Sequence, residues 1–139
     1  MRGLQEYFDL ISRLVEHSGA KSIEVEFNQD PVTGKVKGVL YFYDSSRLEF
    51  AEAVIIERYR PVRLAYRYQY IRAGETVFRY DNARHHPGLP NFPHHQHVGN
   101  ERLSAIEPTL SQVLNEVASL LGEETPPPLT PRRRRRARR

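Results

Sequence analysis

The sequence predicts an α+β fold in which one helix precedes, and another follows, an antiparallel sheet. The apolar residues first repeat at a helical spacing and, after Gly19, change to the two-residue spacing of strands. The strand-like segments are joined by turns of a few residues, which favours an antiparallel meander. Helical spacing returns near residue 109, so we expect both helices to cover one face of the sheet.

The first helix is predicted over residues 4–15. Its apolar side chains share one face and polar residues occupy the other; the apolar set is Leu4, Phe8, Ile11, Leu14 and Val15. Gly19 suits the stop that follows the helix, because glycine adopts the left-handed conformation common there.

Five strands are predicted next, over residues 22–28, 36–43, 47–58, 62–71 and 76–80. The connections contain the residues that favour turns, such as Asp30-Pro31 and Asp44-Ser45. The order of the segments therefore predicts a five-stranded meander.

A long loop, a second helix and a tail complete the expected architecture. The loop is rich in Pro and Gly, and we expect no regular structure in it. Thr109 is the expected N-cap of the second helix and Gly122 its end. Its apolar face consists of Leu110, Val113, Leu114, Val117, Leu120 and Leu121. We expect one domain over residues 1–124 and a disordered Pro- and Arg-rich tail over residues 125–139.

The charge is distributed unevenly along the chain. The formal net charge is +4, and removal of the seven Arg of residues 131–139 leaves −3. The tail is a non-specific signal for RNA, DNA or an acidic partner. There is no cysteine, which excludes disulfides and thiol chemistry. We see no signal peptide and no membrane span, and we expect a soluble, cytoplasmic protein.

Five of the six histidines fall in the loop, as His85, His86, His94, His95 and His97. Imidazole titrates near pH ~6.5 and therefore suits proton transfer at cellular pH. Asp81 and Asn82 immediately precede the loop and suit a turn that fixes where it starts. We expect any active site to lie there.

Three interpretations of the histidines compete. They act as general acid and base in phosphodiester cleavage, with Arg67, Arg79 or Arg84 stabilising the charge on phosphate. Such a ribonuclease needs no metal or other cofactor, because the substrate 2′-hydroxyl is the nucleophile. Alternatively, His97 with His94 or His95 joins Asp81 or Glu49 around a divalent metal. In the third interpretation, the rings are structural.

The fourth predicted strand alternates Tyr and Arg. Period two places Leu64, Tyr66, Tyr68 and Tyr70 on one face and Arg63, Ala65, Arg67, Gln69 and Ile71 on the other. Interleaved Arg and aromatic residues suit RNA, so Tyr68 and Arg67 are candidate substrate-binding residues. In the simpler alternative, the Tyr residues are core, and Arg67 and Arg79 pair with Glu49 and Glu57 on the neighbouring strand.

Four blocks of the sequence together resemble the TumE family of proposed toxins. The blocks are SSRLEFAE (45–52), PVRLAYRYQY (61–70), FRYDNARHHPGLPNFPHHQHVGN (78–100) and TLSQVLNEV (109–117). The resemblance covers roughly residues 20–118, and its most specific part is FRYDNARHH…FPHHQH. The tail departs from the family pattern.

The resemblance implies a growth-inhibiting toxin of a two-gene module, neutralised by a helix-turn-helix antitoxin. It implies a ribonuclease only by analogy with other small toxins. The expected catalytic residues therefore come from the residues themselves: the five loop histidines with Arg79 and Asp81. The alternatives are a non-enzymatic interaction module and a metal-dependent nuclease that uses the same histidines. We expect a homodimer or a toxin–antitoxin hetero-oligomer, and no membrane partner.

Overall fold

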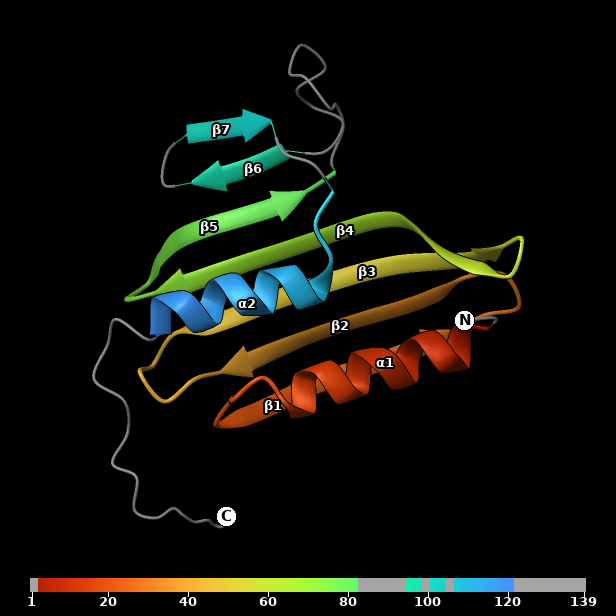
Figure 1. Ribbon diagram of the computed structural model, residues 1–139, viewed down its shortest axis with the longest axis horizontal. Coiled ribbons are helices and arrows are strands. Elements are labelled where there is room, and N and C mark those ends of the chain that lie inside the picture. Colours follow the sequence, from red (N-terminus) through yellow and green to blue (C-terminus); the bar gives the residue numbers. More distant parts are fainter. Residues whose placement is uncertain (1–2, 83–94, 99–100, 105–106, 122–139) are drawn as a thin grey trace.

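The computed structural model describes residues 3–82, 95–98, 101–104 and 107–121. Its strands form one antiparallel sheet of seven strands in the order of the chain, and both described helices lie on the same face of it (Figure 1). The predicted α+β class, with its terminal helices and meander, is confirmed. The elements are α1 (Leu4–Glu16), β1 (Ser22–Gln29), β2 (Gly34–Tyr41), β3 (Arg47–Glu57), β4 (Arg60–Arg72), β5 (Glu75–Asp81), β6 (His95–Val98), β7 (Glu101–Ser104) and α2 (Leu110–Leu121).

The helix α1 packs its predicted apolar face against the sheet. Leu4, Phe8, Ile11 and Val15 are buried, and the helix contacts β1, β2 and β3. Gly19 lies beyond its end with a positive φ of 83°.

The helix α2 begins as the sequence predicts. The Thr109 hydroxyl accepts a hydrogen bond from the Gln112 backbone N–H at 3.1 Å, and the Gln112 side chain accepts one from the Thr109 N–H at 2.8 Å. This reciprocal capping box satisfies two backbone donors that the helix itself leaves unpaired. The helix lies over β4, where Leu110, Val113 and Val117 are buried.

The two faces of the sheet differ in burial. The face under the helices contributes buried residues from each of the central strands, among them Val36, Leu40, Leu48, Phe50, Tyr68, Tyr70 and Phe78. Gly38 lies on this face, where a Cβ atom would come within 2.8 Å of the Phe50 ring. The opposite face carries exposed residues in alternation with this core, and we call it the open face.

A β-bulge interrupts the pairing of β3 and β4. Ala53 pairs with Ala65 but Val54 pairs with Arg63, so Leu64 has no partner on β3 and is 53% exposed. The extra residue changes the alternation and moves Arg63 to the same face as Tyr66 and Tyr68. The prediction that Arg63 lies opposite the Tyr residues is therefore wrong, because strict period-two alternation fails at a bulge.

Part of the predicted irregular loop is a hairpin. Residues His95–Val98 (β6) pair with β5, and Glu101–Ser104 (β7) pair with β6. The expectation of no regular structure is wrong for these eight residues. Between the two strands stands Gly99-Asn100, a dipeptide favoured between hairpin strands, and this is the sequence signal that predicts the pairing.

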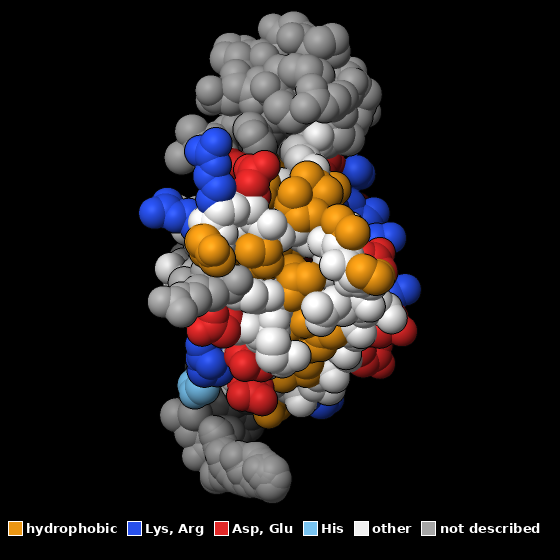
Figure 2. All heavy atoms as spheres, turned by 90° about the vertical axis from the view of Figure 1, so that its right-hand side faces the viewer, with side chains coloured by type: hydrophobic (Ala, Val, Ile, Leu, Met, Phe, Trp, Pro, Cys, Tyr) orange, Lys and Arg blue, Asp and Glu red, His pale blue; other side chains and the backbone are white. Residues whose placement is uncertain are grey.

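Apolar side chains remain visible at one end of the molecule, between charged flanks (Figure 2). This end carries the β3–β4 connection, where Arg58 and Tyr59 both have positive φ and Tyr59 is 76% exposed. No helix of the described residues is long and apolar enough to cross a membrane.

Candidate functional site

The strand register aligns several of the predicted site residues across the open face. Arg67 of β4 pairs with Asp81 of β5, and Asp81 pairs with His95 of β6. In the adjacent row, Gln69 pairs with Arg79, and Arg79 pairs with His97. Neighbouring strands lie about 4.8 Å apart, so the backbones of Arg67 and His95 are about 10 Å apart.

Arg79 and Asp81 form an ion pair, with 2.8 Å between Arg79 Nε and Asp81 Oδ2. The Asp81 side chain is only 4% exposed, whereas that of Arg79 is 33% exposed. The prediction that Arg79 pairs with Glu49 or Glu57 is wrong: Asp81 is its partner, and Glu49 pairs with Arg47 at 2.8 Å. The ion pair therefore places a buried carboxylate beside the Arg79 guanidinium.

Arg67 is exposed and, within the described part of the chain, has no ion-pair partner. Its nearest strand neighbours are small or polar, because it lies between Ala51 of β3 and Asp81 of β5. Its charge is therefore open to solvent and to a ligand.

Tyr68 does not belong to this face. It is fully buried under the helices, and Tyr66 and Tyr70 are at most 4% exposed. The structure thus supports the simpler interpretation of the Tyr stripe as core, and Tyr68 has no surface to offer to a substrate.

Three loop histidines and one arginine of the predicted site, His85, His86, His94 and Arg84, lie outside the described residues. His95 and His97 are placed by their strand pairing alone. No group of three metal-ligating side chains is present among the residues that the structure describes. The metal alternative rests on loop histidines and stays a prediction.

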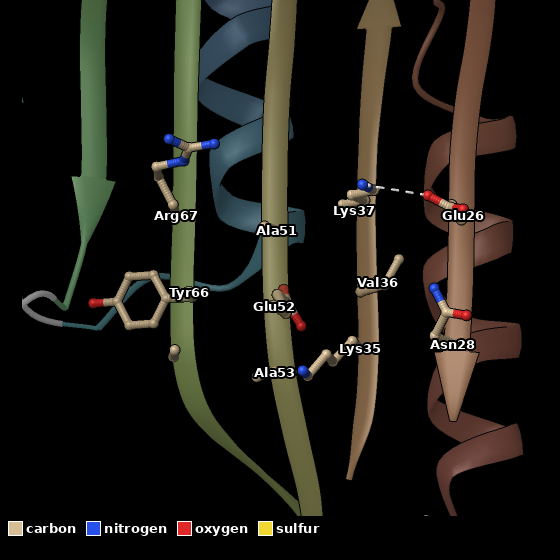
Figure 3. Close-up of a pocket in the computed structure, with 11 residues that line it drawn as sticks. Glu26, Asn28, Lys35, Val36, Lys37, Ala51, Glu52, Ala53, Tyr66 and Arg67 are labelled. Atoms are coloured by element: carbon tan, nitrogen blue, oxygen red, sulfur yellow. Dashed lines mark ion pairs between the residues drawn. The ribbon is translucent and has the colours of Figure 1, made fainter. Parts of the chain in front are cut away.

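Beside Arg67, the open face is hollowed. The hollow has a volume of about 400 Å³, and its lining includes Ala51, Ala53, Ala65, Lys35 and Lys37. Figure 3 shows Ala51 and Ala53 of β3 between Arg67 of β4 on one side and the lysines of β2 on the other. Lys37 makes an ion pair with Glu26 at 3.5 Å.

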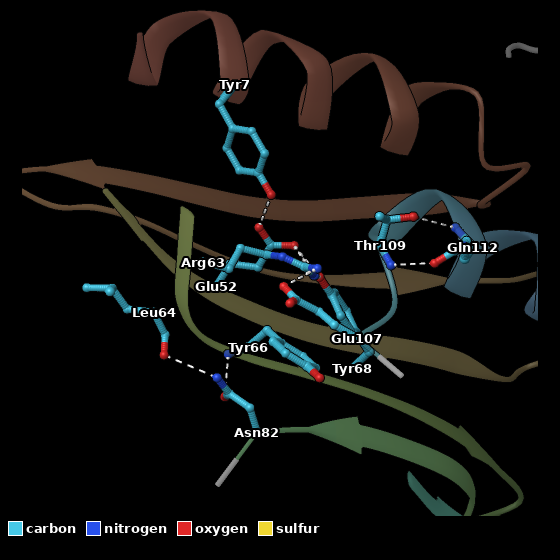
Figure 4. A network of polar contacts seen from close by, with 10 residues as sticks. All are labelled: Tyr7, Glu52, Arg63, Leu64, Tyr66, Tyr68, Asn82, Glu107, Thr109 and Gln112. Carbon is cyan, nitrogen blue, oxygen red and sulfur yellow. Dashed lines mark hydrogen bonds and ion pairs between the residues drawn. The ribbon is translucent and has the colours of Figure 1, made fainter. Parts of the chain in front are cut away.

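A second polar cluster, which the sequence analysis did not predict, lies on the helix-covered face (Figure 4). The Glu52 carboxylate, whose side chain is 0% exposed, accepts hydrogen bonds from the hydroxyls of Tyr7 and Tyr68. Arg63 donates to the Tyr68 hydroxyl at 2.6 Å and to Glu107 at 2.7 Å. Glu107 lies at the exposed end of this cluster, with its side chain 41% exposed, and we call the five residues the buried network.

The buried network perturbs its own ionisable groups. Burial and the neighbouring charge of Glu52 raise the pKa of Tyr7 and of Tyr68 well above the usual value. Burial alone would lower the pKa of Arg63, but the negative charge around it prevails and raises that pKa. These shifts keep both phenols neutral and Arg63 charged. One signal was available in the sequence: Glu52 occupies an inward position between Phe50 and Val54.

Asn82 fixes the chain where β5 ends. Its side chain accepts a hydrogen bond from the Tyr66 N–H at 3.0 Å and donates one to the Leu64 carbonyl at 3.1 Å. These two bonds hold the start of the predicted histidine loop against the bulge of β4 (Figure 4).

Comparison with known families connects this architecture to one class of protein. The family model described as Toxin TumE matches residues 7–121, which include every described strand, α2 and all but the first three residues of α1. No curated protein and no solved structure matches the chain. The match defines a toxin of a toxin–antitoxin module, which has an antitoxin as its partner. The chain belongs to the TumE toxin family.

Proposed function

We propose that this toxin inhibits growth by cutting RNA, and that the cutting site lies on the open face where β4, β5 and β6 meet. The observation that carries the proposal is the register, which aligns Arg67 and Asp81 with His95, and Arg79 with His97. The proposed site thus combines two guanidinium groups with residues of the type that transfers protons near neutral pH.

The chemistry of the proposed cleavage follows from these residue types. One histidine, acting as general base, removes the proton of a ribose 2′-hydroxyl, and the 2′-oxygen attacks the adjacent phosphorus. The bond from phosphorus to the 5′-oxygen breaks, and a second, protonated histidine supplies the proton of the leaving 5′-hydroxyl. The products are a 2′,3′-cyclic phosphate and a 5′-hydroxyl end, without oxidation or reduction.

The arginines contribute charge stabilisation in this scheme. Negative charge builds on the non-bridging phosphate oxygens as the 2′-oxygen attacks, and a guanidinium placed beforehand stabilises it. Arg79 suits this role because Asp81 holds its side chain at 2.8 Å. Arg67 suits it because its charge has no acidic partner within the described residues. Removal of one such donor typically costs about 10²- to 10³-fold in rate.

The proposal also covers the type of antitoxin, the assembly that it forms with the toxin and the compartment in which the complex acts. We expect the antitoxin to be a helix-turn-helix protein that neutralises the toxin in a hetero-oligomer. We expect the complex to act in the cytoplasm, where the RNA substrates are made and translated. Co-expression with the product of the adjacent gene, followed by purification and measurement of molar mass, tests both the partner and the stoichiometry.

Replacement of His94, His95 and His97 by Ala tests the catalytic role. The wild-type protein, expressed without its antitoxin, should arrest growth and break RNA, and the triple variant should do neither. His17→Ala is the matched control, because His17 is an exposed histidine at the end of α1. The control should retain both effects.

Three outcomes would contradict the proposal. Persistence of RNA cleavage in the triple variant would exclude these histidines as the catalysts. Growth arrest without any RNA breakage would favour a non-enzymatic interaction module. Loss of wild-type cleavage in a chelator, with recovery on addition of a divalent metal, would favour a metal-dependent nuclease.

A further inference from the structure

The hollow beside Arg67, which we call the trough, lies over β3 between β2 and β4. Its floor is Ala51, Ala53 and Ala65, the smallest side chains available at three neighbouring positions of β3 and β4. Register places Lys37 opposite Ala51 and Lys35 opposite Ala53, so longer side chains flank the floor on the β2 side. Arg67, opposite Ala51, flanks it on the β4 side. The depth of the trough therefore results from alternating short and long side chains on one sheet face.

The trough is lined by three cations, Lys35, Lys37 and Arg67, and by the carboxylate of Glu26. Neither Lys35 nor Arg67 has an ion-pair partner among the described residues. Lys37 has one, but both side chains of the Lys37–Glu26 pair are more than half exposed and their atoms are 3.5 Å apart. Such an exposed pair contributes only about 0–1 kcal/mol and is readily exchanged for another anion. Three cations thus face a narrow apolar floor.

The trough and the proposed cleavage site share Arg67. Arg67 lines the trough and, on its other side, pairs in register with Asp81 and through it with His95. The backbones of Lys37 and Arg67 are two strands apart, about 10 Å, and Arg67 and His95 are separated equally. An extended anion laid across the strands would contact Lys37, Arg67 and the β5–β6 region in turn.

We propose that this trough binds single-stranded RNA beside the bond that is cut, with phosphates on Lys35, Lys37 and Arg67 and the apolar floor under the sugar and base. The inference rests on the proposed function and adds the substrate class and the path of the chain. A single strand fits because its unpaired bases can turn into a hollow of about 400 Å³, whereas the bases of a duplex are paired in its interior. The charged contacts proposed here go to phosphates, which carry no base identity, so we expect binding with little sequence preference.

The test measures binding and cleavage separately. Fluorescence anisotropy with a 12-nucleotide RNA that carries 2′-O-methyl groups reports binding, because the blocked hydroxyl prevents cleavage. Cleavage is measured on an unmodified 12-nucleotide RNA and on dinucleotides, which do not reach the trough. Lys35→Glu reverses a wall charge and Ala53→Met fills the floor. Lys21→Glu is the matched control, an exposed lysine just before β1.

We expect Lys35→Glu to weaken binding of the 12-nucleotide RNA about tenfold and to lower the salt dependence by about 0.7 of a log unit per log unit of salt. Ala53→Met should weaken binding several-fold, and Lys21→Glu should leave it unchanged. Cleavage of dinucleotides should not change in either trough variant. Urea unfolding curves must show that all three variants remain folded.

The possible failures are distinguishable. If the wild-type protein cuts RNA and both trough variants bind and cut the long RNA normally, the trough inference is wrong and the proposed catalysis stands. If the trough variants lose RNA binding but the wild-type protein cuts no RNA, the proposed catalysis is wrong and the trough stands as an RNA-binding site. A poly-glutamate peptide that binds wild type in preference to RNA, and loses binding in Lys35→Glu, would identify an acidic protein segment as the occupant and overturn the inference.

Discussion

The two faces of the sheet carry the same kinds of residue in different environments. Under the helices, Arg63, Tyr68 and Glu52 bind one another and are almost excluded from solvent. On the open face, four residues further along β4, Arg67 is exposed and without an ion-pair partner among the described residues. The same strand therefore carries one arginine whose hydrogen bonds are made within the protein and one whose bonding capacity is available to a ligand.

This comparison indicates that the buried charged residues contribute to stability, whereas the exposed ones are available for function. A buried charge is tolerated only when its partners are complete, so each member of the buried network depends on the others. An exposed charge contributes little to folding, and its substitution leaves the fold almost unchanged. Each of the following predictions tests whether the two groups of residues differ in this way.

The largest effect on stability is expected from Glu52→Ala. The substitution leaves the hydroxyls of Tyr7 and Tyr68 without their acceptor and removes the carboxylate 4.0 Å from the Arg63 guanidinium, which should lower the free energy of unfolding by about 3–5 kcal/mol. Urea denaturation measures the loss. Glu49→Ala, on the open face of the same strand, should cost no more than about 1 kcal/mol. Equal losses at the two positions would show that the network is not a stabilising unit.

The pair Arg63→Ala and Arg67→Ala compares the two arginines of β4 directly. Arg63→Ala should lower the free energy of unfolding by about 3 kcal/mol, since it removes bonds to Tyr68 and Glu107. Arg67→Ala should change it by less than about 0.5 kcal/mol and reduce RNA cleavage about 100-fold. Urea denaturation and a cleavage assay on the same preparations measure both quantities. A destabilised Arg67→Ala protein with normal cleavage would reverse the assignment.

Asn82→Ala should cost about 1–2 kcal/mol of unfolding free energy, because it removes two hydrogen bonds to the backbone of β4. The change also frees the chain beside Asp81, so we expect slower RNA cleavage at unchanged affinity for the blocked RNA. Asn28→Ala, an exposed asparagine on β1, is the control for stability. Wild-type cleavage by a destabilised Asn82→Ala protein would show that this residue supports only the fold.

The buried network also predicts a loss of stability at alkaline pH. The pKa values of Tyr7 and Tyr68 are raised in the folded protein, whereas in the unfolded chain they lie near ~10. The folded state therefore binds these two protons more tightly than the unfolded chain does. The stabilisation that the protonated phenols give the folded state is complete below pH ~10 and is lost as the pH rises above it. Tyr7→Phe should reduce the slope of unfolding free energy against pH above 10 by up to about 1.4 kcal/mol per pH unit. An unchanged slope in urea denaturation at pH 10–11 would contradict the prediction.

Most of the fold could be predicted because its signals are local. The change from helical to two-residue periodicity located α1 and the first five strands, and Thr109, the expected N-cap, located the start of α2. The Toxin TumE match confirms the family that the FRYDNARHH and FPHHQH segments indicated. The β6–β7 hairpin was missed because the Pro and Gly around it outweighed the Gly99-Asn100 signal in the prediction.

Spacing and residue type over a few positions were enough to predict the alternation of side chains away from the β4 bulge and to indicate which segments carry chemistry. Only the tertiary structure decided that the bulge at Leu64 moves Arg63 under the helices, and that Tyr7 and Glu52, 45 residues apart, share a hydrogen bond. It alone aligned Arg67, Asp81 and His95 across three strands. Strand register and helix docking are selected by the packing of the whole core, and no short stretch of sequence contains that information.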